Sequence, residues 1–311
     1  MTVSELMLAS SGLDMKLLKP LLYYQGADLA VHRTSRNVVM HYELRPNSKA
    51  RVAQVRTVSV NSLGFRGAER AKAKPKGVFR IVCIGGSNTY GNVNDAETYP
   101  AQLEKLLNAA QPGRYEVWNA GLSASVLTQN VEQARNILND YSPDMLLFQI
   151  SNAGRRAFLF DEPFEYYFQN DPGLYAENLY FPPFGRNRVH LTLMRHWRLY
   201  RTAIIAVNHL RRYAAHREQD HSPEADGFNL AAMNDFCARY QAKIPIILLY
   251  YPGLLPEHPS DPMGLRTIVL ADKLPARHPP DYDELHPPAY VYSWYARMIM
   301  ESLRKYGVLP S

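Results

Sequence analysis

Hydrophobic and polar positions change their spacing at about residue 79. Beyond it, short continuous apolar runs alternate with segments whose apolar residues recur at helical spacing. A continuous run is typical of a strand buried on both faces, so the alternation predicts an α/β domain with a parallel sheet of about five strands. The expected strands lie within 79–85, 115–121, 143–150, 244–251 and 264–275, and the expected helices within 98–111, 127–141, 226–243 and 289–306.

Residues 1–78 have a different pattern. The partly alternating runs Val38–Tyr42 and Val52–Val60 predict short strands or extended arms. Ala68–Gly77 is basic, rich in small residues and contains proline, which is typical of a connector. We therefore expect an N-terminal accessory segment and connector at 1–78 and a main domain at 79–311.

A long insertion, residues 153–225, separates the third expected strand from the next helix. Its first part, 158–184, has ten aromatic side chains, five acids and no base, whereas 186–217 has eight arginines, four histidines and no acid. A helix is expected at 199–216. Two interpretations stay open. In the first, the aromatic part is a lid and the arginine-rich part is a surface that meets a phosphate, a carboxylated glycan or a membrane face. In the second, the aromatic side chains form a small satellite core and the arginines lie on a solvated helix face.

Composition narrows the functional classes. The chain has 311 residues, of which 46% are hydrophobic and 21% charged, which is ordinary globular usage. A net charge of +6 is too small to indicate nucleic acid as the ligand. The two cysteines have neither disulfide nor metal-ligand spacing, so we expect no metal and no cofactor, with Cys83 a small buried apolar residue. The chain has no signal-peptide pattern and no apolar run long enough to span a bilayer, which predicts a cytoplasmic protein, or a periplasmic or membrane-associated one if the native N-terminus is longer.

The stretch FRIVCIGGSNTYG, at Phe79–Gly91, ends the first expected strand with a glycine–serine turn. A P-loop would need a lysine after the glycines, and a dinucleotide-binding turn would need GxGxxG, so neither fits. Two hypotheses remain for Ser87. It caps a helix behind a tight turn, or it is a nucleophile that needs a base, an acid that orients the base, and donors for an oxyanion.

Candidates for those partners lie after other strands. Asp283 and His286 are three residues apart in DYDELHPP, so the carboxylate can accept the Nδ1 proton of the histidine and leave Nε2 for the serine. Asp281 and Glu284 are less favoured alternatives to Asp283. Gly121 ends the second strand and lets a backbone N–H approach a ligand. Asn152 follows the third strand, and its side-chain amide can donate a hydrogen bond to an oxyanion. Each of these residues, taken alone, also fits an ordinary turn, helix cap or solvated loop.

Together these four blocks resemble the SGNH/GDSL hydrolase superfamily. GGSNTYG resembles its nucleophile turn with Ser87 as nucleophile, Gly121 and Asn152 match the second and third blocks, and Asp283 and His286 match the last block. The resemblance covers roughly residues 55–160 and 240–306 and includes the NSLGFRG approach. It implies a three-layer flavodoxin-like sheet with strand order 2-1-3-4-5. It also implies acyl transfer from an ester, with the oxyanion held by the N–H groups of Ser87 and Gly121 and by the Asn152 amide.

The third block departs from the pattern of the family. The family has G-x-N-D, whereas this chain has Ile150, Ser151, Asn152 and Ala153, so the loop lacks the glycine and the aspartate. Arg155 and Arg156 follow directly and are the arginines best placed to touch substrate. We expect a serine esterase acting on an O-acyl group of a carbohydrate or small lipid. An acyltransferase with the same residues, or an inactive binding or assembly module, are the alternatives.

Overall fold

The computed structural model describes residues 3–13, 16, 23–24, 28–37, 39–52, 56–150, 157–160, 188–214, 223–251, 265–270 and 286–310. Our predictions for Asp283, Asn152, Arg155 and Arg156 lie outside these residues, and so does most of the aromatic part of the insertion.

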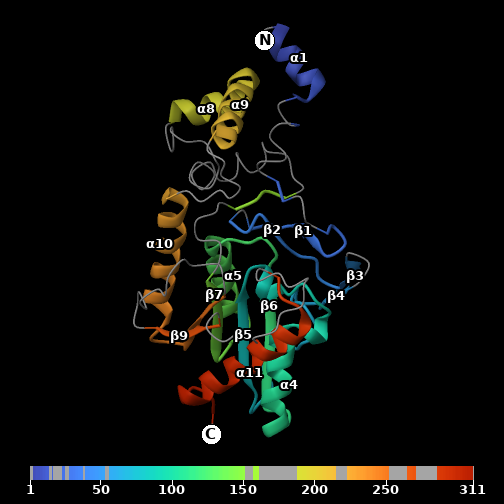
Figure 1. Cartoon of the computed structure of the whole chain (residues 1–311), viewed down its shortest axis with the longest axis vertical. Helices are drawn as coiled ribbons and strands as arrows, with labels where there is room; N and C mark the ends of the chain where they lie inside the picture. Colours follow the sequence, from blue (N-terminus) through green and yellow to red (C-terminus); the bar gives the residue numbers. More distant parts are fainter. Residues whose placement is uncertain are drawn as a thin grey trace.

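A five-stranded parallel sheet is the centre of the molecule (Figure 1). Its order is β6-β5-β7-β8-β9, which is 2-1-3-4-5 along the domain, as expected. Gly85 is paired with Gly121, and Ile150 with Tyr250, so the carboxyl ends of the strands meet along one edge. The strands are β5 (Phe79–Gly85), β6 (Tyr115–Gly121), β7 (Met145–Ile150), β8 (Ile246–Tyr250) and β9 (Arg266–Val269).

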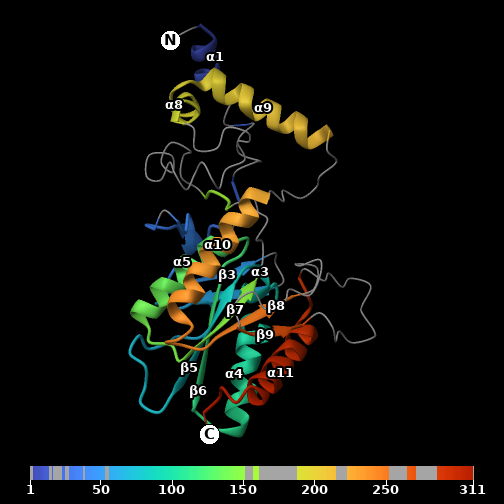
Figure 2. The same ribbon diagram turned by 90° about the vertical axis from the view of Figure 1, so that its left-hand side faces the viewer.

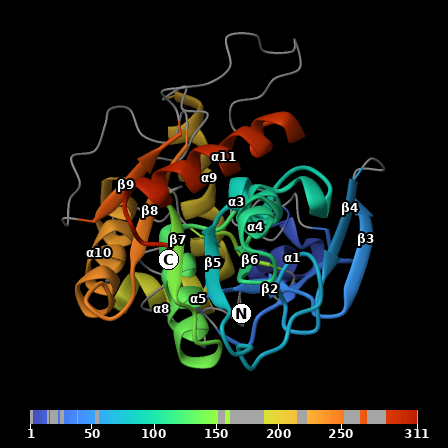
Figure 3. The ribbon, with the colours of Figure 1, turned by 90° about the horizontal axis from the view of Figure 1, so that it is seen from below.

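Helices cover both faces of the sheet (Figures 2 and 3). Because successive strand residues point to opposite faces, Ile81 and Cys83 pack on one side with α4 and α11, whereas Val82 and Ile84 pack on the other with α5 and α10. The expected three-layer fold and its helices are therefore confirmed. These helices are α4 (Tyr99–Ala110), α5 (Leu127–Asp140), α10 (Pro223–Tyr240) and α11 (Ala289–Lys305).

Two antiparallel strand pairs form the described core of the N-terminal segment. The predicted run Val52–Val60 contains one of these strands, whereas in the run predicted at Val38–Tyr42 residues 39–41 form a turn and only Tyr42 begins a strand. The Asn37 side chain accepts the Val39 N–H at 3.0 Å, and His41 has a φ of 58°, so the chain turns there. The strands are β1 (His32–Thr34), β2 (Tyr42–Leu44), β3 (Ser48–Val52) and β4 (Arg56–Val60).

This segment packs on the carboxyl edge of the sheet. The Tyr42 hydroxyl donates to the Ser123 carbonyl at 2.7 Å, and the Tyr24 hydroxyl lies 2.8 Å from the Ser123 hydroxyl. Ser123 lies in the loop that follows β6. A separate apolar cluster fills the contact: Val31, Met40, Tyr42, Leu44, Val58, Val60, Tyr90, Leu122 and Phe160. Phe160 belongs to the aromatic part of the insertion, and here it serves as a core residue.

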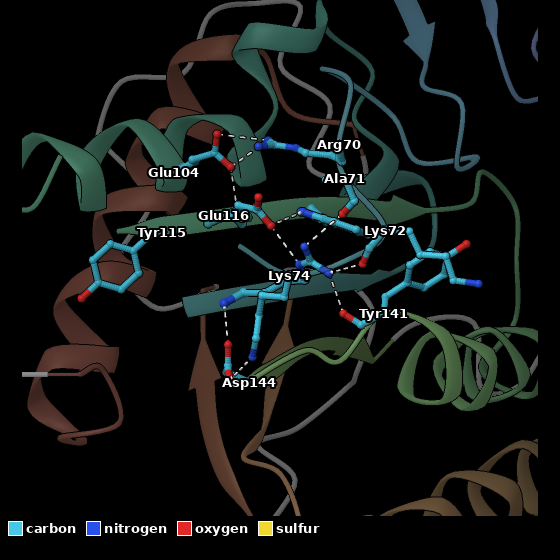
Figure 4. Close-up of polar contacts among 12 residues, drawn as sticks. Arg70, Ala71, Lys72, Lys74, Glu104, Tyr115, Glu116, Tyr141 and Asp144 are labelled. Carbon is cyan, nitrogen blue, oxygen red and sulfur yellow. Dashed lines mark hydrogen bonds and ion pairs between the residues drawn. The ribbon is translucent and has the colours of Figure 1, made fainter. Parts of the chain in front are cut away.

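The connector at 68–77 is held at the opposite edge of the sheet by polar contacts of Ala71, Lys72 and Lys74 (Figure 4). Arg80 on β5 is fully buried; its Nε donates to Glu116 at 2.8 Å, and its guanidinium lies 4.1 Å from the Trp118 ring centre. Lys74 of the connector pairs with Asp144 at 2.6 Å. The Arg80 guanidinium also donates to the carbonyls of Ala71, Lys72 and Tyr141.

Three helices lie at the end of the molecule away from the C-terminus (Figure 1). They are α1 (Val3–Ser11), α8 (Arg188–His196) and α9 (Arg198–Ala214). We call them the three-helix group. The helix predicted at 199–216 corresponds to α9. Among the described residues, no helix combines the length and apolar character needed to cross a bilayer.

Candidate active site

Ser87 begins a short helix, α3 (Ser87–Tyr90), directly after β5. The capping position belongs to Gly86, and no side chain caps the helix, so the structure does not support the hypothesis that Ser87 is a helix cap. Instead, the Ser87 Oγ lies 3.1 Å from the His286 Nε2, although 199 positions separate the two residues in the chain. This is the distance at which an imidazole can accept a hydroxyl proton.

His286 is placed by the terminal helix. It lies three residues before α11, whose buried face carries Val291, Tyr292 and Tyr295 into the core beneath the sheet. Both Ser87 and His286 are half-buried, so the pair is partly shielded from water and still open to a ligand. The fold thus brings a hydroxyl and an imidazole together at the carboxyl edge, where ligands bind in open α/β sheets.

Gln149 at the end of β7 holds α3 from one side. Its Oε1 accepts the Thr89 N–H at 3.0 Å and the Thr89 hydroxyl at 2.7 Å, and all three groups are buried. A Cβ on Gly85 would lie 2.5 Å from the Gln149 Cβ and from the Thr89 Oγ1. Gly85 is therefore glycine because this junction leaves no room for a side chain.

Strand β6 holds α3 from a second side. A Cβ on Gly121 would lie 2.0 Å from the Tyr90 backbone nitrogen, so β6 and the helix are in direct backbone contact. Asn119 donates from Nδ2 to the Tyr90 carbonyl at 3.3 Å and accepts the Gly121 N–H on Oδ1 at 2.9 Å. The Gly121 N–H, expected to face an oxyanion, therefore has an internal partner in this structure.

Arg66 of the N-terminal segment holds the end of α3. The side chain is buried, and its guanidinium lies 4.7 Å from the Tyr90 ring centre. It donates to the carbonyls of Tyr90, Gly91 and Val93, and its Nε pairs with Asp95 at 2.9 Å. A cation at the carbonyl end of a helix is favourable, and this one fixes the whole turn.

Burial decides the protonation of several neighbours of the site. It raises the pKa of Tyr90 to about 12, against a smaller opposing effect of Arg66. Burial also raises the pKa of the Cys83 thiol, which is fully buried as expected, so this cysteine stays neutral and is not a competing nucleophile. Tyr99, whose hydroxyl lies 3.3 Å from the Thr89 Oγ1, likewise has a pKa well above its usual value because it is buried.

The structure thus brings together Ser87, His286 and the strand end at Gly121. Their catalytic roles, and those of Asp283 and Asn152, stay predictions. Within the described part of the chain, no cluster of side chains could hold a metal ion. The sequence analysis missed three residues that position the turn: Gln149, Asn119 and Arg66. Two features of the sequence could have pointed to them, since Arg66 belongs to the NSLGFRG stretch and Gln149 lies at the end of an expected strand.

The decisive observation for the fold is the strand order together with the place of the Ser87–His286 pair. The serine turn follows the first strand of a 2-1-3-4-5 sheet, and the histidine precedes the last helix. The fold is that of the SGNH/GDSL hydrolases. That Ser87 is the nucleophile and that Gly121 corresponds to the second block stay predictions from the sequence.

No protein-family model and no curated protein matches the sequence. Among solved structures, the chain is similar to a protein assigned to the lipolytic G-D-S-L family from Desulfitobacterium hafniense DCB-2, with 12% identity, 72% of this chain and 99% of that chain covered, and a TM-score of 0.38. LAE5, an α/β hydrolase from the metagenome of Lake Arreo, Spain, has 15% identity, 75% and 97% coverage and a TM-score of 0.41. AlinE4, an SGNH-hydrolase family esterase, has 18% identity, 57% and 60% coverage and a TM-score of 0.28. At these identities and TM-scores, none of these similarities carries an argument about the role or substrate of this chain.

Proposed function

We propose that this protein is a serine esterase of the SGNH/GDSL type that removes an acetyl or short acyl group from an oxygen of a carbohydrate or small lipid. The observation that carries the proposal is the 3.1 Å separation of the Ser87 Oγ and the His286 Nε2 at the carboxyl edge of the sheet. A serine hydroxyl is a weak nucleophile until a base takes its proton, and this geometry supplies the base.

The reaction has two acyl-transfer steps. His286 accepts the Ser87 proton while the Ser87 Oγ attacks the ester carbonyl, and it then protonates the leaving alcohol oxygen. Water, activated by the same imidazole, attacks the acyl-enzyme and releases the acid with Ser87 restored. Asp283 orients the imidazole through Nδ1 in this proposal.

The negative oxygen that forms in each step needs donors. Ser87 is the first residue of α3, and its N–H has no partner in the described part of the chain, which supports an oxyanion role. The Asn152 amide is the proposed second donor. The Gly121 N–H joins them only when its bond to the Asn119 side chain opens, so the proposal requires a small movement of Asn119 on substrate binding.

A fluorophosphonate probe tests the proposal, because it reacts covalently with activated serines. We expect wild-type protein to be labelled and Ser87→Ala to be inert, and we expect His286→Gln to react about 10²–10⁴-fold more slowly. Ser293→Ala is the matched control, since within the described part of the chain that hydroxyl bonds the Ala289 carbonyl of its own helix and no other group. Folded wild-type protein that is not labelled would refute the proposal.

Product analysis then separates hydrolysis from transfer. We expect a panel of p-nitrophenyl esters to give free acid with water as the acceptor, most rapidly with the shortest chains. An acyl product formed on an added alcohol or glycan in preference to free acid would instead identify an acyltransferase that uses the same Ser87.

A further inference from the structure

Arg56 of the N-terminal segment reaches the loop that follows the helix of Ser87. It is the first residue of β4, and its Nη1 donates to the carbonyl of Asn92 at 3.2 Å. The next N–H along β4, that of Thr57, is accepted by the Asn94 side chain at 2.9 Å. Because α3 is a single short helix that rises about 1.5 Å per residue, this loop begins within roughly 10 Å of Ser87. The start of β4 therefore lies beside the candidate active site.

The guanidinium of Arg56 lies near both helices of the site. Tyr90 on α3 and Tyr292 on α11 are close enough to raise its pKa. Helix α11 also packs on the short turn η1 (Asp95–Glu97), which directly follows the loop that Arg56 contacts. Since α3 begins with the candidate nucleophile and α11 follows the candidate base, the cation is placed beside the pair.

No acid neutralises the charge of Arg56. In the described part of the chain, no carboxylate forms an ion pair with its guanidinium. The two acids that follow the loop have other partners, since Asp95 pairs with Arg66 at 2.9 Å and Glu97 accepts two N–H groups of Asn94 at 2.9 Å. Burial is the main reason that the pKa of Arg56 is lowered, and the charge of Arg66 lowers it further. A bound anion would relieve both effects.

One edge of the Arg56 guanidinium is unpaired. Nη1 is occupied by the Asn92 carbonyl, whereas Nε is buried without a partner, and Nη2 makes no hydrogen bond to any residue that the structure describes. Nε and Nη2 are the two parallel donors on one side of a guanidinium, and they match two oxygens of a carboxylate or a phosphate. A buried N–H without an acceptor is unfavourable, so an oxyanion at this edge would satisfy it.

The Tyr90 hydroxyl supplies another donor. Burial raises the pKa of Tyr90 to about 12, so the hydroxyl keeps its proton at neutral pH, and Arg56 and Arg66 both lie close enough to oppose that shift. The hydroxyl has no hydrogen-bond partner among the described residues. Arg66 is not available for a ligand, because its guanidinium is committed to Asp95 and to the carbonyls of the turn. Arg56 is thus the cation of this corner with donors to offer.

We propose that Arg56 and the Tyr90 hydroxyl bind a carboxylate or phosphate group on the alcohol part of the substrate, so that the enzyme acts on anionic esters. The inference rests on the proposed function, because it names the substrate class of the same site. An acetyl or short acyl group carries no charge, which assigns the anion to the alcohol part. Because Nε is covered in this structure, the guanidinium has to turn toward the anion when substrate binds.

Three acetate esters test the proposal: phenyl acetate, 4-acetoxybenzoate, which carries a carboxylate, and 4-acetoxyphenyl phosphate. The quantity to compare is kcat/KM for each anionic ester divided by kcat/KM for phenyl acetate. Comparing this ratio between proteins removes the different intrinsic reactivities of the esters. We expect Arg56→Gln to lower the ratio about 10–100-fold, mainly through KM, because a charge-assisted pair of hydrogen bonds is lost. The anionic ester with the larger loss identifies the preferred group.

Arg51→Gln is the matched control. Arg51 is exposed on β3 and is paired with Thr57, so it shares a face with Thr57 and lies on the opposite face of the strand pair from Arg56. The substitution removes the same charge, and we expect the ratio to stay at its wild-type value. Arg56→Lys should restore only part of the ratio, because a lysine keeps the charge without the paired donors.

A second measurement needs no turnover. Inorganic phosphate should raise the Tm of the Ser87→Ala protein more than sodium chloride of equal ionic strength does, and adding Arg56→Gln should abolish the difference. Hydrolysis of phenyl acetate with equal ratios in wild-type protein and Arg56→Gln would overturn the inference and leave the esterase proposal intact. Equal stabilisation by phosphate with and without Arg56→Gln would also overturn it. If folded wild-type protein hydrolyses none of the three esters, the esterase proposal itself fails, and the assignment of a substrate class fails with it.

Discussion

Substitution of Gly121 by alanine should inactivate Ser87 without removing any group that takes part in the chemistry. The new Cβ would lie 2.0 Å from the Tyr90 nitrogen and 2.5 Å from the Thr89 carbonyl carbon, and both atoms are backbone. Ordinary contact begins at 3.4 Å, so α3 must withdraw from β6 by about 1.4 Å. A displacement of about 1 Å at a reacting group slows a reaction roughly 10²-fold, and we expect at least that loss in the rate of fluorophosphonate labelling.

The control has to separate displacement of the turn from general loss of stability. Gly113→Ala makes the same chemical change at a position with a φ of 72° and no atom within 4 Å of the new Cβ. It should lower the free energy of unfolding by about 1–2 kcal/mol through backbone strain and leave the labelling rate unchanged. If Gly121→Ala is folded and labelled at the wild-type rate, α3 is not fixed against β6, and our account of the site is wrong.

Three other substitutions test the contacts around the site and beneath it. Arg66→Met should lower the free energy of unfolding by about 3–5 kcal/mol in urea titrations, because it leaves Asp95 and the carbonyls of the turn without their cation. Arg66→Lys should restore only part of the fluorophosphonate labelling rate that Arg66→Met loses. Arg80→Met should cost a similar amount of stability while the remaining folded protein is labelled normally, because this network lies at the other edge of the sheet. Burial lowers the pKa of His32 in the folded chain. As the pH falls below about 6.5, the imidazole therefore binds a proton in the unfolded chain before it does so in the folded chain, and the folded state loses stability. His32→Phe should therefore lose less stability than wild-type protein between pH 7 and pH 5, and equal losses in urea titrations would contradict a buried neutral imidazole.

The sheet domain was predictable because its strands are buried on both faces. A strand such as β7 is apolar at nearly every position, and the amphipathic helices between such strands leave few other arrangements. The strand order itself came from the family resemblance and not from the spacing of apolar residues. The run Val38–Tyr42 misled for a physical reason: Met40 is buried in the small N-terminal core although the chain turns there, and the strand begins only at Tyr42.

The candidate site was predictable only in part. Ser87 and His286 have a chemical signature that can be searched for, because nucleophilic serine chemistry needs a base. Gln149 and Arg66 have no such signature, since glutamine and arginine occur everywhere and their effect arises only when strands far apart in the chain meet. The internal partner of the Gly121 N–H was equally hidden, because it depends on the Asn119 side chain two residues earlier on the same strand.

The contacts of the N-terminal segment have a consequence for the order in which the chain folds during synthesis. The Arg66 N–H bonds the Asn119 carbonyl, and the Ser59 N–H bonds the Asp95 side chain, so these partners are synthesised about 35 to 50 residues after the groups that need them. At roughly 5–20 residues per second, the segment leaves the ribosome several seconds before β6 exists. During that interval its strands have no sheet to pack on. The segment is thus made before the sheet on which it packs, and its own packing is completed only after that sheet has formed.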